Sequence, residues 1–167
     1  MEEQDTWFVL NTREARWFDR GPRGWVCNFD PEGAKFPQVG INLFVLEPGQ
    51  PMAMYHWEAD QEDYLVLSGE ALLIVDEEER PLRQWDFLHT PAGVPHVLVG
   101  AGSGPSVILA IGAREHQGGE GWGAYPVSDV AAKHDAASPV ETSDAQVAYA
   151  RFPDRQESPY REGWLPS

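Results

Sequence analysis

The chain has 167 residues, of which 42% are hydrophobic, and its formal net charge at pH 7 is −15. A chain of this length can bury a core of its own, so we expect one domain with arms rather than two domains. The negative charge argues against nucleic acid and anionic membrane surfaces as partners, because their phosphates would be repelled over most of the protein surface. A ligand is therefore expected to be small, neutral or held through a metal ion.

The sequence also bounds the compartment. Its single cysteine, Cys27, cannot form an internal disulfide. The acidic start, Met1 to Asp5, lacks the basic and apolar regions of a secretory signal, and no apolar run reaches the roughly 18 residues that span a bilayer. We therefore expect a soluble, cytoplasmic protein.

Short apolar runs, separated by glycine, proline and acidic turns, follow one another from about residue 7 to residue 127. This pattern is typical of many short strands and predicts an all-β sandwich or barrel. The acidic run Asp76–Glu79 between two apolar segments is interpreted as a solvated hairpin turn. In chain order, the predicted strands cover residues 7–11, 15–18, 24–29, 40–47, 53–58, 63–76, 86–90, 96–100 and 106–113.

The sequence changes character after residue 114. The glycine-rich stretch 116–126 lacks the lysine of a phosphate-binding loop and is interpreted as a connector. Ser143, with Gln146 three residues later, forms a capping box that predicts a short helix to about Arg151, and a weaker helix is predicted over 128–135. The tail keeps three aromatic residues, Phe152, Tyr160 and Trp164. A disordered tail would rarely keep them, so we expect it to pack across the barrel or against a partner subunit.

Imidazole and carboxylate side chains gather in the middle of the sequence. Residues two apart on a strand share a face, so His56 and Glu58 are expected to point the same way. Glu62 follows after a turn, and His96 begins a later strand. If these four side chains converge in a small barrel, they form a candidate site for a divalent metal ion.

These residues fall on two motifs, and on them the sequence resembles the cupins. The first cupin motif contains a glycine, then His-x-His, a glutamate and a closing glycine, matched by Gly49, His56, Glu62 and Gly69. The heart of the second motif, Pro-x-Gly-x-x-His, is matched by Pro91, Gly93 and His96, and Asp86 takes the place of its early acidic residue.

The resemblance covers roughly residues 40 to 112 and implies a jelly roll, also called a double-stranded β-helix, with a metal ion near the middle of the barrel. We therefore expect a single cupin domain over residues 1–167. Its motif-bearing barrel would cover about 36–114, with extra N-terminal strands in 1–35 and a short helical or irregular C-terminal arm in 115–167.

The sequence departs from the family pattern at four places. Gly49 lies one residue farther from His56 than usual, Trp85 replaces the opening glycine of the second motif, and Gly100 replaces its final asparagine. Glu58 stands where the second histidine is expected, and only this change affects the chemistry.

Glu58 has three interpretations. As a fourth ligand it would make a harder site of two histidines and two glutamates, which suits Mn or Fe(II) and still admits Zn. As a general base it would stand beside a metal ion held by His56, Glu62 and His96. It could also be a supporting or solvent-facing residue.

The surroundings of the metal site are less specific. Apolar side chains that could line a pocket above it are Phe44, Met52, Met54 and Tyr64, although such residues are more often plain core. His89 could lie at the mouth of the barrel, or be an ordinary loop histidine.

Two functions compete. One is a metal-dependent oxygenase or isomerase that acts on a small organic substrate. The other is a non-catalytic module that binds or senses a small ligand. In either case we expect a homodimer, because the N-terminal strands carry three tryptophans that could extend a sheet into a neighbour.

Overall fold

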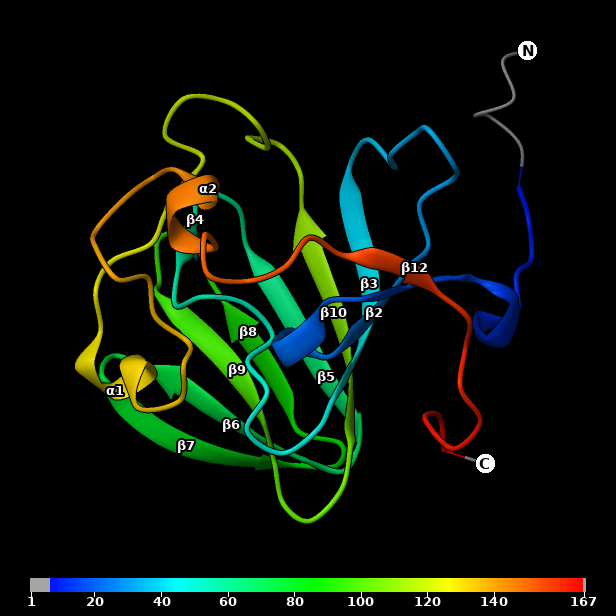
Figure 1. Cartoon of the computed structure of the whole chain (residues 1–167). Coiled ribbons are helices and arrows are strands. Elements are labelled where there is room, and N and C mark those ends of the chain that lie inside the picture. Colours follow the sequence, from blue (N-terminus) through cyan, green and yellow to red (C-terminus); the bar gives the residue numbers. More distant parts are fainter. Residues whose placement is uncertain (1–6, 167) are drawn as a thin grey trace.

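The computed structural model describes residues 7–166, which form mainly antiparallel β-strands (Figure 1). The strands are β1 (Arg16–Asp19), β2 (Trp25–Asn28), β3 (Val39–Leu46), β4 (Trp57–Glu58), β5 (Glu62–Ser68), β6 (Glu70–Val75), β7 (Glu78–Arg83), β8 (Phe87–Thr90), β9 (His96–Ala101), β10 (Ser106–Ala113), β11 (Gly123–Ala124) and β12 (Gln156–Ser158). The short helical elements are η2 (Thr12–Glu14), η3 (Gly21–Arg23), α1 (Asp129–Ala132) and α2 (Ala145–Ala148).

Two sheets form the barrel. The larger sheet has seven strands in the order β12-β1-β2-β3-β10-β5-β8, and the smaller has three in the order β7-β6-β9. A two-stranded ribbon pairs β11 with β4. This arrangement confirms the all-β jelly roll that the sequence predicted.

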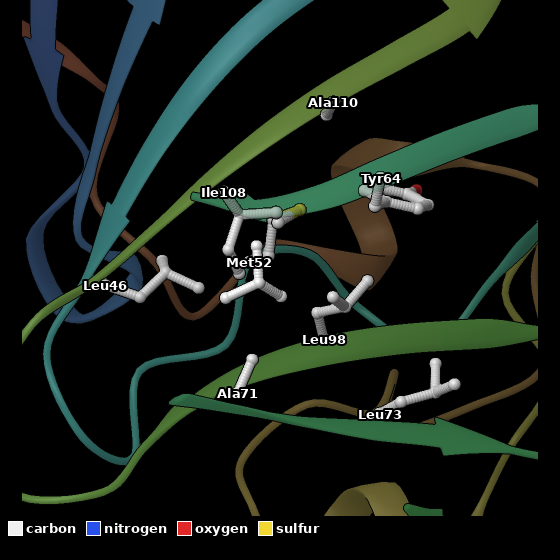
Figure 2. Close-up of a cluster of buried hydrophobic side chains, with 9 residues drawn as sticks. Leu46, Met52, Tyr64, Ala71, Leu73, Leu98, Ile108 and Ala110 are labelled. Atoms are coloured by element: carbon white, nitrogen blue, oxygen red, sulfur yellow. The ribbon is translucent and has the colours of Figure 1, made fainter. Parts of the chain in front are cut away.

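The core lies between the two sheets (Figure 2). Burial alternates along strand β5, so that Tyr64 and Val66 are buried while Leu65 between them is only half-buried. They meet side chains of the smaller sheet, among them Leu73 and Leu98. The barrel interior near its middle is therefore apolar, and the polar groups described below have to satisfy one another.

Several strands differ from the prediction. Residues 7–11 form no strand, and Trp7 is 85% exposed. Strand β7 was missed because it is polar and carries Pro81, which is tolerated since β7 is an edge strand. The predicted turn is tighter than expected: Asp76 and Glu77 both have positive φ, and β7 begins directly after them.

Gly69 divides the predicted strand 63–76 into β5 and β6. Its φ is +73°, and a Cβ there would lie 2.6 Å from the Pro105 carbonyl oxygen. Gly49 also has a positive φ, +86°, but a Cβ there would meet nothing within 4 Å. The closing glycine of the first motif is thus required by both its dihedral angle and its close neighbour.

Gly69→Ala is expected to lower the free energy of unfolding by about 2 kcal/mol or more, because strain in the left-handed region adds to the clash. Gly49→Ala is the matched control and is expected to cost only the conformational part, about 1 kcal/mol. Urea unfolding of the two variants measures the difference. Equal losses would show that the contact with Pro105 does not matter.

The N-terminal strands and the C-terminal tail complete the larger sheet together. Strand β12 pairs with the outer edge of β1. Trp164 is buried against Trp17, with ring centroids 5.0 Å apart, and Tyr160 joins the same cluster. The tail therefore packs on the N-terminal strands of its own chain.

This pairing removes the free β1 edge as a basis for the expected homodimer, which stays a prediction. Exposed aromatic side chains remain next to and on edge strand β8, where Trp85 and Phe87 are each 66% exposed. We expect light scattering at micromolar concentration to give twice the chain mass. A clean monomer would contradict the prediction.

Both predicted C-terminal helices are present as short helices, but the cap of the second differs from the prediction. Ser128 caps α1 by accepting a hydrogen bond from the Ala131 amide. Helix α2 is capped by Asp144, whose carboxylate accepts from the Gln146 amide at 2.8 Å, so the predicted Ser143 cap is wrong. Asp144 is the N-cap because it is one residue closer to the helix than Ser143, and its oxygen reaches the Gln146 amide directly. None of the helices in residues 7–166 is long and apolar enough to cross a membrane.

Candidate metal centre and its cavity

Backbone pairing brings the two motif histidines together. His56, just before β4, forms an isolated antiparallel bridge with His96, the first residue of β9. The amide of each donates to the carbonyl of the other, at 3.1 and 2.8 Å. Their rings consequently lie side by side, with centroids 5.2 Å apart.

Glu62, the first residue of β5, faces both rings. Its Oε2 lies 3.5 Å from Nε2 of His56 and 3.4 Å from Nε2 of His96. One ligand atom from each of the three residues falls within 4.8 Å of the others. Three of the four predicted ligands therefore converge on one point.

The hydrogen bonds fix the tautomer of both histidines. Nδ1 of His56 lies 2.7 Å from the Met54 carbonyl oxygen, and Nδ1 of His96 lies 2.9 Å from that of Val94. A carbonyl oxygen can only accept, so each Nδ1 carries a proton. In the neutral imidazoles both Nε2 lone pairs then point toward Glu62, which is the form that binds metals.

The carboxylate of Glu62 indicates whether the site suits a metal ion. Its Oε1 accepts a hydrogen bond from the Tyr64 hydroxyl at 2.9 Å, whereas Oε2 is buried and has no hydrogen-bond partner within residues 7–166. A buried carboxylate oxygen without a partner is costly. A cation between this oxygen and the two Nε2 atoms would satisfy it, and two imidazoles with a carboxylate suit Mn, Fe(II) or Zn. The residues present therefore fit a divalent metal ion.

Charge in the centre leads to the same conclusion. Burial opposes protonation of His56, but the nearby carboxylates outweigh it and raise its pKa. Burial lowers the pKa of His96, and the charge of His56 lowers it further. Burial disfavours ionisation of Glu62, yet its contacts with His56 lower its pKa. The carboxylates thus attract one positive charge, either a proton or a metal ion.

Glu58 stands beside this group rather than inside it. Its Oε1 is 3.8 Å from Nε2 of His56, and its carboxylate lines the cavity next to the centre. Burial, with the nearby charge of Glu62, raises the pKa of Glu58 to about 7. The solvent-facing interpretation does not match this position, whereas ligand and general base both do.

The cavity has a volume of about 280 Å³. Of the predicted pocket residues, Phe44, Met52 and Tyr64 line it, as do His56, Glu58 and Glu62. Its other lining residues are Arg20, Arg23, Gly40, Asn42, Ala53, Ala110, Ile111, Gly112, Ala113, Arg114, Gln117, Tyr125 and Tyr149.

Two predicted pocket residues lie elsewhere. Met54 is fully buried and does not border the cavity. His89 lies on the outer face of β8, since its neighbour Thr90 is the one that points inward, and its Nδ1 is 2.6 Å from Asp63. The alternation of side chains along the strand could have shown this, because His89 lies on the face opposite to that of its neighbours Leu88 and Thr90.

The sequence analysis predicted none of these other lining residues, and four of them matter for the chemistry. Arg20 and Arg23 come from the turn around η3, and Tyr125 and Tyr149 from the C-terminal arm. The Tyr149 hydroxyl accepts a hydrogen bond from the Met54 amide at 3.1 Å, which fixes the arm over the barrel. Two arginines in a short glycine-proline turn were the only local signal.

A jelly roll in which two histidines and a glutamate converge beside a cavity defines a class of barrel, and the family comparison agrees with it. Residues 42–112 match the family model described as the cupin domain. The chain therefore contains a cupin domain, as the two motifs indicated.

Solved structures extend the comparison. A putative sugar phosphate isomerase from Acidithiobacillus ferrooxidans is 27% identical with a TM-score of 0.50, over 57% of this chain and 64% of that one. A sugar phosphate isomerase of the cupin superfamily from Silicibacter pomeroyi is 28% identical with a TM-score of 0.50, over 55% and 60%. The match thus spans less than two thirds of either relative.

A third structure shares the fold alone. The polyketide cyclase RemF from Streptomyces resistomycificus is 12% identical with a TM-score of 0.57, over 66% of this chain and 81% of that one. A comparison with curated proteins gave no match.

Proposed function

We propose that this protein is a metal-dependent enzyme that isomerises a small organic molecule inside the barrel. The observation that carries the proposal is the buried Glu62 Oε2, which has no hydrogen-bond partner in the described part of the chain and faces the Nε2 atoms of His56 and His96. A cavity adjoins these groups, and a second carboxylate, that of Glu58, borders it.

His56, Glu62 and His96 would hold the ion, and Glu58 would be either a fourth ligand or the base. When bound, Mn, Fe(II) or Zn supplies Lewis acidity that polarises a substrate oxygen. The Glu58 carboxylate, which borders the cavity 3.8 Å from His56 Nε2, can take a proton from the substrate and return it. The Tyr64 hydroxyl donates its proton to Glu62 Oε1 at 2.9 Å and so holds this carboxylate in place.

Isomerisation is preferred to oxygenation for two reasons. Moving a proton between neighbouring carbons needs one base and one polarising group, and no further reactant. Two structures at 27% and 28% identity are also named as sugar phosphate isomerases, one of them putatively. Those names belong to the relatives and support the reaction class proposed here.

The test begins with the metal. Protein reconstituted in turn with Mn, Fe(II) and Zn is expected to keep about one ion per chain through gel filtration. The loaded protein is then incubated with a set of sugar phosphates in deuterium oxide, and NMR is expected to show deuterium at the carbon next to the carbonyl. Retention of no ion would contradict the metal centre. Ion and ligand binding without exchange would favour a binding or sensing module.

A further inference from the structure

Two arginines, Arg20 and Arg23, line the cavity that adjoins the metal centre. Arg20 follows β1 and is only 6% exposed, and Arg23 lies in η3. Both line the same cavity as the metal centre. Within residues 7–166 neither guanidinium forms an ion pair, whereas Arg114 on the same cavity wall is paired with Asp30 at 2.8 Å.

Neutral groups hold the two guanidinium groups in place. Arg20 donates from Nη1 to the Met52 carbonyl at 2.7 Å and from Nη2 to the Arg23 carbonyl, and it lies 4.8 Å from the centre of the Phe44 ring. Arg23 lies over Tyr149 at 4.6 Å. In both arginines Nε is buried and has no hydrogen-bond partner. The positions are fixed, but the charges are not neutralised.

This arrangement is costly for the free protein. A buried charge without a counter-charge destabilises the fold. The chain has 27 acidic residues, yet within residues 7–166 none of them forms an ion pair with Arg20 or Arg23. Burial, together with the nearby charge of Arg23, lowers the pKa of Arg20 to about 9. An anionic ligand would remove the penalty, and a guanidinium matches the planar oxygens of carboxylates and phosphates.

We infer that Arg20 and Arg23 form an anion subsite that binds the carboxylate or phosphate group of the substrate, apart from the metal centre. That the bound anion is a substrate rests on the proposed function. Anion binding by these two residues does not require the metal. The cavity, at about 280 Å³, lies near the lower end of the roughly 300–1,000 Å³ of ligand pockets, so the ligand is a small metabolite.

Aromatic rings connect the anion subsite to the metal centre. Arg23 lies over Tyr149, Tyr149 meets Tyr125 edge-on with centroids 5.6 Å apart, and Tyr125 lies 5.9 Å from the His56 ring. A small molecule lying along these rings would hold its anionic end at the arginines and its reacting carbons near Glu58. The subsite would thereby set both specificity for anions and the orientation of the substrate.

The test measures anion binding separately from metal binding. Inorganic phosphate and succinate are titrated by calorimetry into the full chain, with and without bound Mn, so that the two probes separate phosphate from carboxylate recognition. Arg23→Met is expected to weaken the preferred anion by about tenfold or more, as loss of a hydrogen bond to a charged group implies. Its metal content should equal that of wild type.

Two further variants make the result decisive. Arg80→Met removes the same charge from the exposed strand β7, far in sequence from the cavity, and should change anion affinity by less than about twofold. Arg20→Lys keeps the charge but loses the planar pair of N–H donors, so it should also weaken anion binding. Circular dichroism checks that this variant is folded.

Wild type without saturable anion binding would overturn the inference, as would Arg23→Met with wild-type affinity or an equal loss in Arg80→Met. If anion binding depends on Arg23 but no metal is retained, the proposed function fails and the subsite stands. If metal is retained but Arg23→Met has no effect, only the subsite fails.

Discussion

His96→Ala is expected to lose the bound divalent ion and, with it, metal-dependent turnover. His96 is 2% exposed, and its Nε2 is one of only three donor atoms of the group centred on Glu62. Without the ion, the carboxylates of Glu58 and Glu62 repel each other, so thermal stability should fall as well. Elemental analysis and thermal unfolding measure the two effects.

The control has to separate metal loss from a damaged core. His89→Ala removes an imidazole from the outer face of β8 and should keep the ion. Added Mn should stabilise wild type and His89→Ala by about 2.7 kcal/mol at a hundredfold excess over the dissociation constant, and should not stabilise His96→Ala. If His96→Ala retains the ion as wild type does, His96 is not a ligand.

Glu58→Gln is expected to lower turnover by about a hundredfold or more while the metal content stays nearly unchanged. The amide has almost the shape of the carboxylate, but it cannot accept a proton from the substrate. The Glu58 oxygen is 3.8 Å from His56 Nε2 and stands outside the group of three donors, which favours this outcome over direct ligation.

Glu58→His distinguishes the alternative. If Glu58 is a ligand, the glutamine variant should lose much of its metal, whereas the histidine variant should restore the usual set of the first motif and keep it. The preference should then move toward later first-row ions, which favour imidazole. Full turnover in Glu58→Gln would exclude the role as base.

The candidate metal centre was predictable because its residues are fixed by local geometry. His56 and Glu62 sit on short paired segments, and Gly69 ends the strand where only a positive φ fits. Strand alternation and motif spacing describe such arrangements well, since each depends on a few neighbouring residues. The apolar barrel strands β3, β5, β6, β8, β9 and β10 were found for the same reason.

The rest of the cavity depends on contacts between distant segments. Nothing near Tyr149 in the sequence indicates that its hydroxyl meets the Met54 amide, 95 residues away. The same is true of Arg20 and Arg23, whose loop reaches the barrel only because β2 pairs with β3. Strand β7 was missed because its side chains are polar, and β12 because it is short and exists only as a partner of β1.

The bond between the Tyr149 hydroxyl and the Met54 amide bears on how ligands enter and leave. Tyr125 and Tyr149, in the part of the C-terminal arm before β12, line the cavity, and none of the metal ligands His56, Glu62 and His96 lies in that part. Segments outside the main sheets can open locally at a smaller free-energy cost than global unfolding. We therefore expect release of the arm around Tyr149 to act as a gate, so that exchange of ligand is governed by this opening while the metal ligands stay in place.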